Sequence, residues 1–140
     1  MAEKEFITWK EKWKTGIKKI DEQHNHFVEI INKTAELIRK KQDGPRLSAI
    51  LVDLTEFARV HFSTEEKYFD ETNYPETEEH KKKHSELLEK VLLFDKQFEK
   101  RKEDFKFMKE FLDFLKFWLE DHLVQVDHRY VKWLTEHGIK

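Results

Sequence analysis

His61 and Glu65 are the residues whose types and spacing most directly predict chemistry in this chain. They are four positions apart, and residues four apart lie on the same face of an α-helix. Hydrophobic residues recur at steps of three and four on that face: Leu47, Leu51, Leu54, Ala58 and Phe69. The periodicity therefore places an imidazole and a carboxylate on the buried side of a helix. A buried carboxylate is costly unless it is paired, hydrogen-bonded or bound to a metal, so we expect other polar groups to meet Glu65 there.

Further histidines and one aspartate fit the same pattern. The complete candidate set is His24, His61, Glu65, His80, His84, His122 and Asp127. The constant rise of a helix allows the depth of each candidate in a bundle to be compared. Measured from the turns that join successive helices, the candidates fall at nearly one level. Surface histidines have no reason to align in this way, so the pattern predicts one buried layer of ligands.

Five imidazoles and two carboxylates are too many ligands for one zinc ion, which takes four. Two octahedral metals bridged by both carboxylates and a solvent oxygen would use all of them. Three histidines complete one metal, and two leave the other with an open position. Imidazole and carboxylate ligands favour iron, manganese or zinc.

Each element of this set has an ordinary explanation when it is taken alone. His80 and His84 are typical of a solvated face, His24 of a core histidine bonded to a carbonyl, and His61 with Glu65 of a buried ion pair. Their alignment favours the metal site. The five-residue step from His122 to Asp127 is about 140° on an ideal helix, so either the aspartate bridges from the side or a π-bulge intervenes. The remaining three histidines fit no such scheme and are expected to be exposed: His26, His128 and His137.

Composition bounds the class of protein. The 140 residues suffice for one domain with a real core. Lys plus Arg (27) nearly balance Asp plus Glu (29), which gives no electrostatic reason to expect nucleic acid or an anionic membrane as partner. There is no cysteine, so disulfides and thiolate metal sites are excluded. Without a signal peptide or an apolar run of spanning length, we expect a soluble, cytoplasmic protein.

The elements that must position the ligands are predicted to be helices. Three glycines, two prolines and abundant Glu, Lys, Leu and Phe favour long helices. The expected ranges are an arm at about 1–18 and helices at about 20–41, 46–69, 75–99 and 103–122, the last possibly reaching 133. Short connections favour a single all-α domain over residues 1–140: an antiparallel up-down four-helix bundle with an N-terminal arm and a C-terminal helical extension. The last helix has two apolar stripes, which predict either a wide core face or a contact between copies of the chain.

The residues also resemble the hemerythrin family, in particular its single-domain bacterial members. The similar stretches are TGIKKIDEQH at 15–24, HFSTEE at 61–66, YP at 74–75 with the histidines that follow, and WLEDH at 118–122 with Asp127. The resemblance covers about residues 9 to 130. It implies two non-haem iron ions with an oxo or hydroxo bridge, one iron held by His80, His84 and His122 and the other by His24 and His61. Glu65 and Asp127 would bridge both, with dioxygen bound at the iron that has two histidines.

An imidazole-rich site surrounded by Phe and Trp is expected to release dioxygen again, whereas sites richer in Glu favour cleavage of the O–O bond. The leading hypothesis is therefore reversible dioxygen binding, for carriage, storage or delivery, by a non-enzymatic monomer or weak homo-oligomer. The alternatives are a di-iron enzyme (peroxidase, ferroxidase or nitric oxide reduction), an oxygen or redox sensor, and a metal-free structural bundle.

Overall fold

The computed structural model describes residues 6–40, 44–101 and 104–140, without the side chains of 44–45, 99 and 123–127. Every regular element in these ranges is helical, which confirms the all-α prediction for the described residues. In chain order the elements are η1 (Glu11–Trp13), α1 (Lys18–Arg39), α2 (Gly44–Thr72), α3 (Thr77–Arg101), α4 (Phe105–Phe117), η2 (Trp118–Val126), η3 (Asp127–Tyr130) and α5 (Val131–Glu136). Two of these are 3-10 helices, η1 and η3, and η2 is a π-helix.

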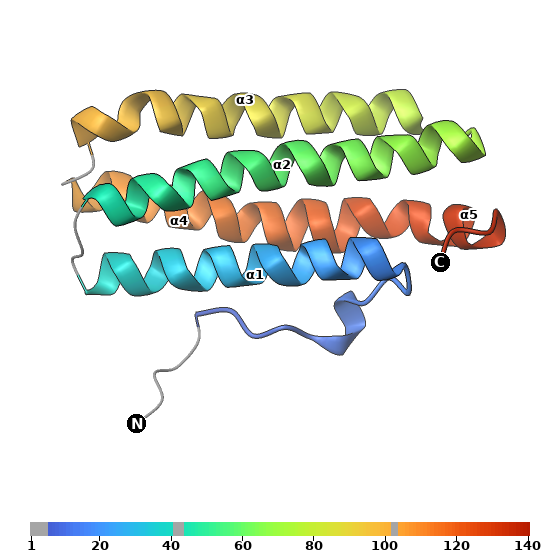
Figure 1. Ribbon diagram of the computed structural model, residues 1–140, viewed down its shortest axis with the longest axis horizontal. Coiled ribbons are helices and arrows are strands. Elements are labelled where there is room, and N and C mark those ends of the chain that lie inside the picture. Colours follow the sequence, from blue (N-terminus) through green and yellow to red (C-terminus); the bar gives the residue numbers. More distant parts are fainter. Residues whose placement is uncertain (1–5, 41–43, 102–103) are drawn as a thin grey trace.

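The four long helices lie side by side with their axes nearly aligned, and the chain reverses direction at each connection (Figure 1). α1 packs on α2 and α4, and α3 packs on the same two helices, so the four close around a common core. α5 lies at the end of the bundle where α2 ends and α3 begins (Figure 1). Among the described residues, no helix combines the length and the apolar character that crossing a membrane requires.

The start of α1 depends on Asp21. Its carboxylate accepts hydrogen bonds from the Thr15 backbone N–H (2.8 Å), the Thr15 hydroxyl (2.9 Å) and the Gly16 N–H (3.1 Å). The chain turns here through Gly16, whose φ of 83° favours glycine. The helix therefore begins at Lys18, two residues before the predicted start, and His24 lies on its second turn.

The other boundaries shift for local reasons. α2 extends to Thr72, three residues beyond the prediction, because its end is made by Asn73 in the left-handed region (φ 54°). α3 begins at Thr77, two residues after Pro75, and the Thr77 hydroxyl donates to the Tyr74 carbonyl (2.6 Å). The predicted end of the first helix at Lys41 lies outside the described residues.

α4 begins after an N-cap residue, Asp104, that was not predicted from the sequence. The Asp104 side chain accepts a hydrogen bond from the Phe107 N–H (3.3 Å), as N-cap aspartates do. This bond, followed by the neighbouring Arg101 guanidinium, lowers the pKa of the Asp104 carboxyl. The predicted turn at 100–104 includes residues 102–103, which lie outside the described ranges.

The described part of the N-terminal arm packs along the bundle. Ile7 and Trp13 are buried in the core, whereas Phe6 is exposed. Asn32 of α1 pairs with the backbone of Ile7, accepting from its N–H (2.7 Å) and donating to its carbonyl (2.8 Å). His128 holds the other end of the arm through its Nε2, 2.9 Å from the Trp13 carbonyl oxygen.

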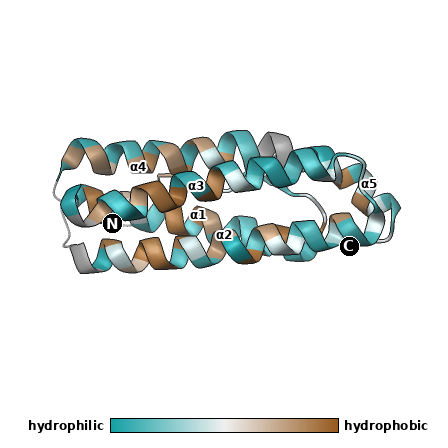
Figure 2. Cartoon of the chain, turned by 90° about the horizontal axis from the view of Figure 1, so that it is seen from above, coloured by the Kyte–Doolittle hydropathy of each residue, from teal (hydrophilic) through white to brown (hydrophobic). Residues whose placement is uncertain are grey.

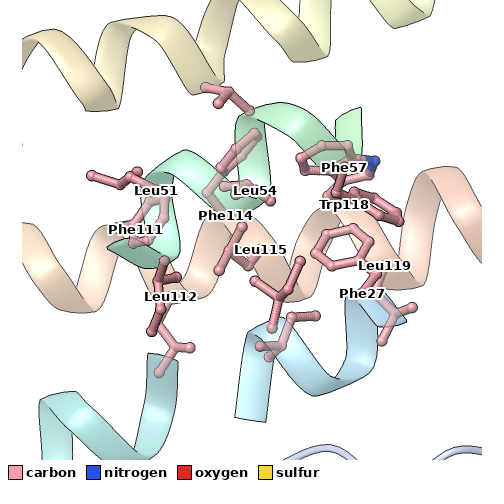
Figure 3. Close-up of a cluster of buried hydrophobic side chains, with 14 of the residues drawn as sticks. Phe27, Leu51, Leu54, Phe57, Phe111, Leu112, Phe114, Leu115, Trp118 and Leu119 are labelled. Atoms are coloured by element: carbon pink, nitrogen blue, oxygen red, sulfur yellow. The ribbon is translucent and has the colours of Figure 1, made fainter. Parts of the chain in front are cut away.

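Each helix carries both hydrophobic and hydrophilic stretches along its length (Figure 2), as amphipathic helices of a bundle should. The main core is the large buried cluster shared by α1, α2, α3 and α4, part of which is shown in Figure 3. Both predicted apolar stripes of the fourth helix are buried in it, which favours the wide core face: Phe107, Phe111, Phe114, Trp118, Met108, Leu112, Leu115 and Leu119. The end core is a second, smaller cluster: Ile17, Ile20, Phe69, Tyr74, Tyr130 and Leu134.

Candidate metal centre

α2 and α3 bring one carboxylate and three imidazoles into contact. Glu65 and His61 of α2 are completely buried, and His61 Nε2 lies 3.3 Å from Glu65 Oε1. From α3, His84 Nε2 lies 2.9 Å and His80 Nε2 3.7 Å from the same oxygen. Three ring nitrogens therefore converge on a single carboxylate oxygen.

The π-helix η2, which follows α4 directly, adds His122. Its ring centroid lies 5.2 Å from that of His80 and 5.4 Å from that of His84. One ligand atom from each of Glu65, His80, His84 and His122 lies within 4.8 Å of the others, and all four residues are buried. This is a compact group of potential metal ligands drawn from three helical segments.

His24 completes the layer from α1. It is 2% exposed, and its ring lies 5.0 Å from the ring of His61 in an edge-on arrangement. The structure thus gathers six of the seven predicted ligands in one buried layer. Their role as metal ligands stays a prediction.

The side chain of the seventh, Asp127, lies outside the described part of the molecule, but the helix type of the backbone before it is described. The segment Trp118–Val126 is a π-helix, whose hydrogen bonds join residues five apart. The step from His122 to Asp127 runs through this π-helix and ends at the first residue of η3, so it does not follow ideal α-helical geometry. Of the two sequence alternatives, the structure contains the helix distortion. Whether Asp127 bridges the metals stays a prediction.

The proton on His61 can be assigned from a chain of hydrogen bonds. The Thr64 hydroxyl donates to the Val60 carbonyl (2.9 Å), so its oxygen accepts from the Gln23 side-chain N–H (3.0 Å). The amide oxygen of Gln23 must then face His61 Nδ1, at 2.7 Å. Because that oxygen only accepts, Nδ1 carries the proton and Nε2 turns its lone pair toward Glu65.

His84 is held in the same way by a carboxylate. Its Nδ1 lies 2.8 Å from Glu66 Oε2, which only accepts when ionised. In a neutral ring this leaves the Nε2 lone pair facing Glu65 Oε1 at 2.9 Å. Two electron-rich atoms at that distance in a buried site require a proton or a metal cation between them. The donor set therefore fits a metal ion, with imidazole nitrogens and carboxylate oxygens as ligands.

Comparison with known proteins agrees with this geometry. The family model of the hemerythrin HHE cation binding domain matches residues 15–134. The chain belongs to the hemerythrin family. It is 33% identical over 129 residues to a bacteriohemerythrin of Clostridium acetobutylicum, a match that covers 90% of this chain and 99% of that protein. It is 26% identical over 125 residues to a bacteriohemerythrin of Pseudomonas aeruginosa PAO1 (89% of this chain, 79% of that protein) and 28% identical over 122 residues to a myohemerythrin of Riftia pachyptila (87% and 88%).

Aromatic rings cover the ligand layer of this hemerythrin domain on both sides. From the main core, Phe62 stacks on His84 with centroids 4.1 Å apart, and Phe57 stacks on His61 at 5.3 Å. From the end core, the ring of Phe69 meets His80 edge-on at 4.9 Å. Apolar rings on both sides exclude water, which strengthens the electrostatic interactions inside the layer.

Three features of the structure were not predicted from the sequence. Gln23 and Glu66 were not singled out, although each is adjacent in sequence to a predicted ligand and lies on a flank of its helix. His128, which was expected to be exposed, is half-buried because its ring reaches the Trp13 carbonyl. His26 is 44% exposed beside Asp53, and His137 is exposed, as expected.

Proposed function

We propose that residues 1–140 form a single hemerythrin-like domain, an antiparallel up-down four-helix bundle, that binds dioxygen reversibly at a carboxylate-bridged di-iron centre. His80, His84 and His122 would hold one iron, and His24 and His61 the other. Glu65 and Asp127 would bridge them, with an oxo or hydroxo bridge as the third link. When bound, the two ferrous ions supply the electrons that make dioxygen binding possible and take them back on release.

The observation that carries this proposal is the convergence of three histidine nitrogens on one oxygen of a fully buried Glu65. Four buried groups with ligand atoms within 4.8 Å of one another are costly in a core unless a cation binds them. The match to the cation binding domain points the same way.

The surroundings favour binding over catalysis. Apart from His24, the rings that stack on or lie beside His61 among the described residues are Phe57 and Phe62, which have no proton to give. Tyr130 lies on the other side, its ring 5.7 Å from His80 of the proposed three-histidine iron. The lining of a surface pocket of about 300 Å³ includes Gln23 and Phe57, which both contact His61, so a small ligand has an approach to this side.

The test is an absorption spectrum of the chain loaded anaerobically with ferrous iron, exposed to air and then purged. We expect two irons per chain and a visible band that appears in air and disappears on purging. Immediate conversion to a stable ferric spectrum would instead support an oxidase or peroxidase. A chain that takes up no iron would refute the di-iron assignment.

Two variants of neighbouring histidines on α1 sharpen this test. His24→Ala removes a proposed ligand that is 2% exposed, so we expect loss of the reversible band. His26→Ala removes a surface imidazole that is 44% exposed and should leave the band unchanged. Equal behaviour of the two variants would exclude His24 from the site.

A further inference from the structure

Two of the proposed ligand imidazoles differ in the group that holds their outer nitrogen. His61 Nδ1 is held by a neutral amide, Gln23 Oε1, at 2.7 Å. His84 Nδ1 is held by a carboxylate, Glu66 Oε2, at 2.8 Å. The two bonds have nearly the same length, so the difference between them is one of charge.

This difference changes the two rings as ligands. A hydrogen bond to a carboxylate is charge-assisted and stronger than one to an amide. It draws the Nδ1 proton away from the ring and makes Nε2 a better electron donor toward a metal. Solvent weakens the effect only in part, because His84 is 3% exposed and the Glu66 side chain 32% exposed.

We propose that Glu66 and Gln23 are positioning residues that make the two metal positions unequal. Glu66 gives the position of His80, His84 and His122 the higher affinity, so that it loads first, whereas Gln23 leaves the position of His24 and His61 weaker. The inference rests on the proposed di-iron function, because it needs two metals per chain. To the inequality that three histidines against two already imply, it adds a contribution from the residues behind the ligands.

The amide at position 23 is itself held in place. Its N–H donates to the Thr64 hydroxyl oxygen, which in turn donates to the Val60 carbonyl. A glutamate at 23 would present an oxygen where the N–H now lies, and the Thr64 hydroxyl can rotate to donate to it. Gln23→Glu is therefore a conservative change that gives His61 the kind of partner His84 already has.

The experiment is an anaerobic titration of the metal-free full chain with cobalt(II) in competition with a chelator, followed by the visible spectrum of bound cobalt. The native chain should bind two cobalt ions in two separate phases. In Glu66→Gln the tighter phase should weaken by about 10- to 100-fold, the usual effect of removing an outer partner of a metal ligand. In Gln23→Glu the weaker phase should strengthen, so that both variants bring the two phases together.

Matched controls make the same charge changes away from the site. Glu71→Gln alters an exposed residue of the same helix as Glu66, and Gln97→Glu alters a residue near the opposite end of α3. Both should keep the two phases of the native chain. Circular dichroism of each metal-free variant identifies any change that acts by unfolding the bundle.

The outcomes separate the two proposals. Two cobalt ions whose affinity ratio is the same in the native chain and in both variants would overturn the inference and leave the di-iron function standing. Equal weakening of both phases in Glu66→Gln would also overturn it, since a merely structural role predicts that result. A single cobalt ion in the native chain would overturn the di-iron function itself.

Discussion

Removal of the metal should lower the thermal stability of this bundle by an amount that reveals how many metals it binds. The proposed ligands come from five helical segments, with His24 on α1, Glu65 on α2, His84 on α3, His122 on η2 and Asp127 on η3. An unfolded chain does not hold these groups together, so the metal binds the folded state and stabilises it.

The expected shift follows from the length of the chain. For 140 residues the entropy of unfolding is about 0.3 kcal/mol per kelvin, so 1 kcal/mol corresponds to about 3.4 °C in Tm. Free metal at 100 times its Kd contributes about 2.7 kcal/mol per site. One site then raises Tm by about 9 °C and two sites by about 18 °C.

The assay is differential scanning calorimetry of the chain under anaerobic conditions, with ferrous iron in fixed excess and with a chelator. A tenfold rise in that excess adds about 1.4 kcal/mol per filled site, so a further rise in Tm of about 9 °C supports two metals and one of about 5 °C supports a single metal. Glu65→Ala should abolish most of the shift, whereas Glu71→Ala should preserve it. Equal Tm values with iron and with chelator would refute the reasoning.

Three further predictions concern stability. Gly16→Ala should cost about 1–2 kcal/mol in thermal unfolding, because φ is 83° although the added Cβ meets no atom within 4 Å. Phe111→Ala should cost about 3–5 kcal/mol in urea unfolding, since Phe111 is buried in the main core. Phe117 lies on the same helix but is exposed, so Phe117→Ala should cost less than about 0.5 kcal/mol. Burial and the hydrogen bond to Glu76 raise the pKa of Tyr74 above its ordinary value of 10.0. The stability of the fold should therefore hold below pH 10 and fall as the pH rises above it. Ultraviolet spectra should show one phenol that titrates later than the others.

Much of the candidate site could be predicted because it follows helical periodicity. His61, Glu65, His80 and His84 occur at steps of four, so the sequence alone places each pair on one face. The residues that hold the outer nitrogens were not predictable in this way. Gln23 and Glu66 lie on the flanks of their helices, and only the packing of α1 on α2 and of α2 on α3 brings them to His61 and His84.

Helix ends show the same division between local and distant causes. Gly44 and Pro45 are a pair typical of the end of one helix and the start of the next, and α2 begins at Gly44. The start of α1 could not be predicted in this way, because it depends on hydrogen bonds from Thr15 to the Asp21 carboxylate, which folds back over the chain. His128 was misjudged because its partner, the Trp13 carbonyl, is 115 residues away in the sequence.

The π-helix shows how a misfit in the sequence can indicate structure. On an α-helix the step from His122 to Asp127 separates the two residues by about 140°, which would conflict with a shared site. In the structure the helix type changes over Trp118–Val126, so the ideal α-helical angle does not apply there. Such segments are rare and occur frequently at functional sites. Trp118, at the start of the segment, is completely buried against Phe27, with ring centroids 4.6 Å apart, so the main core anchors the distortion where it begins. The main core therefore holds the π-helix in place at its first residue, four positions before His122 of the ligand layer.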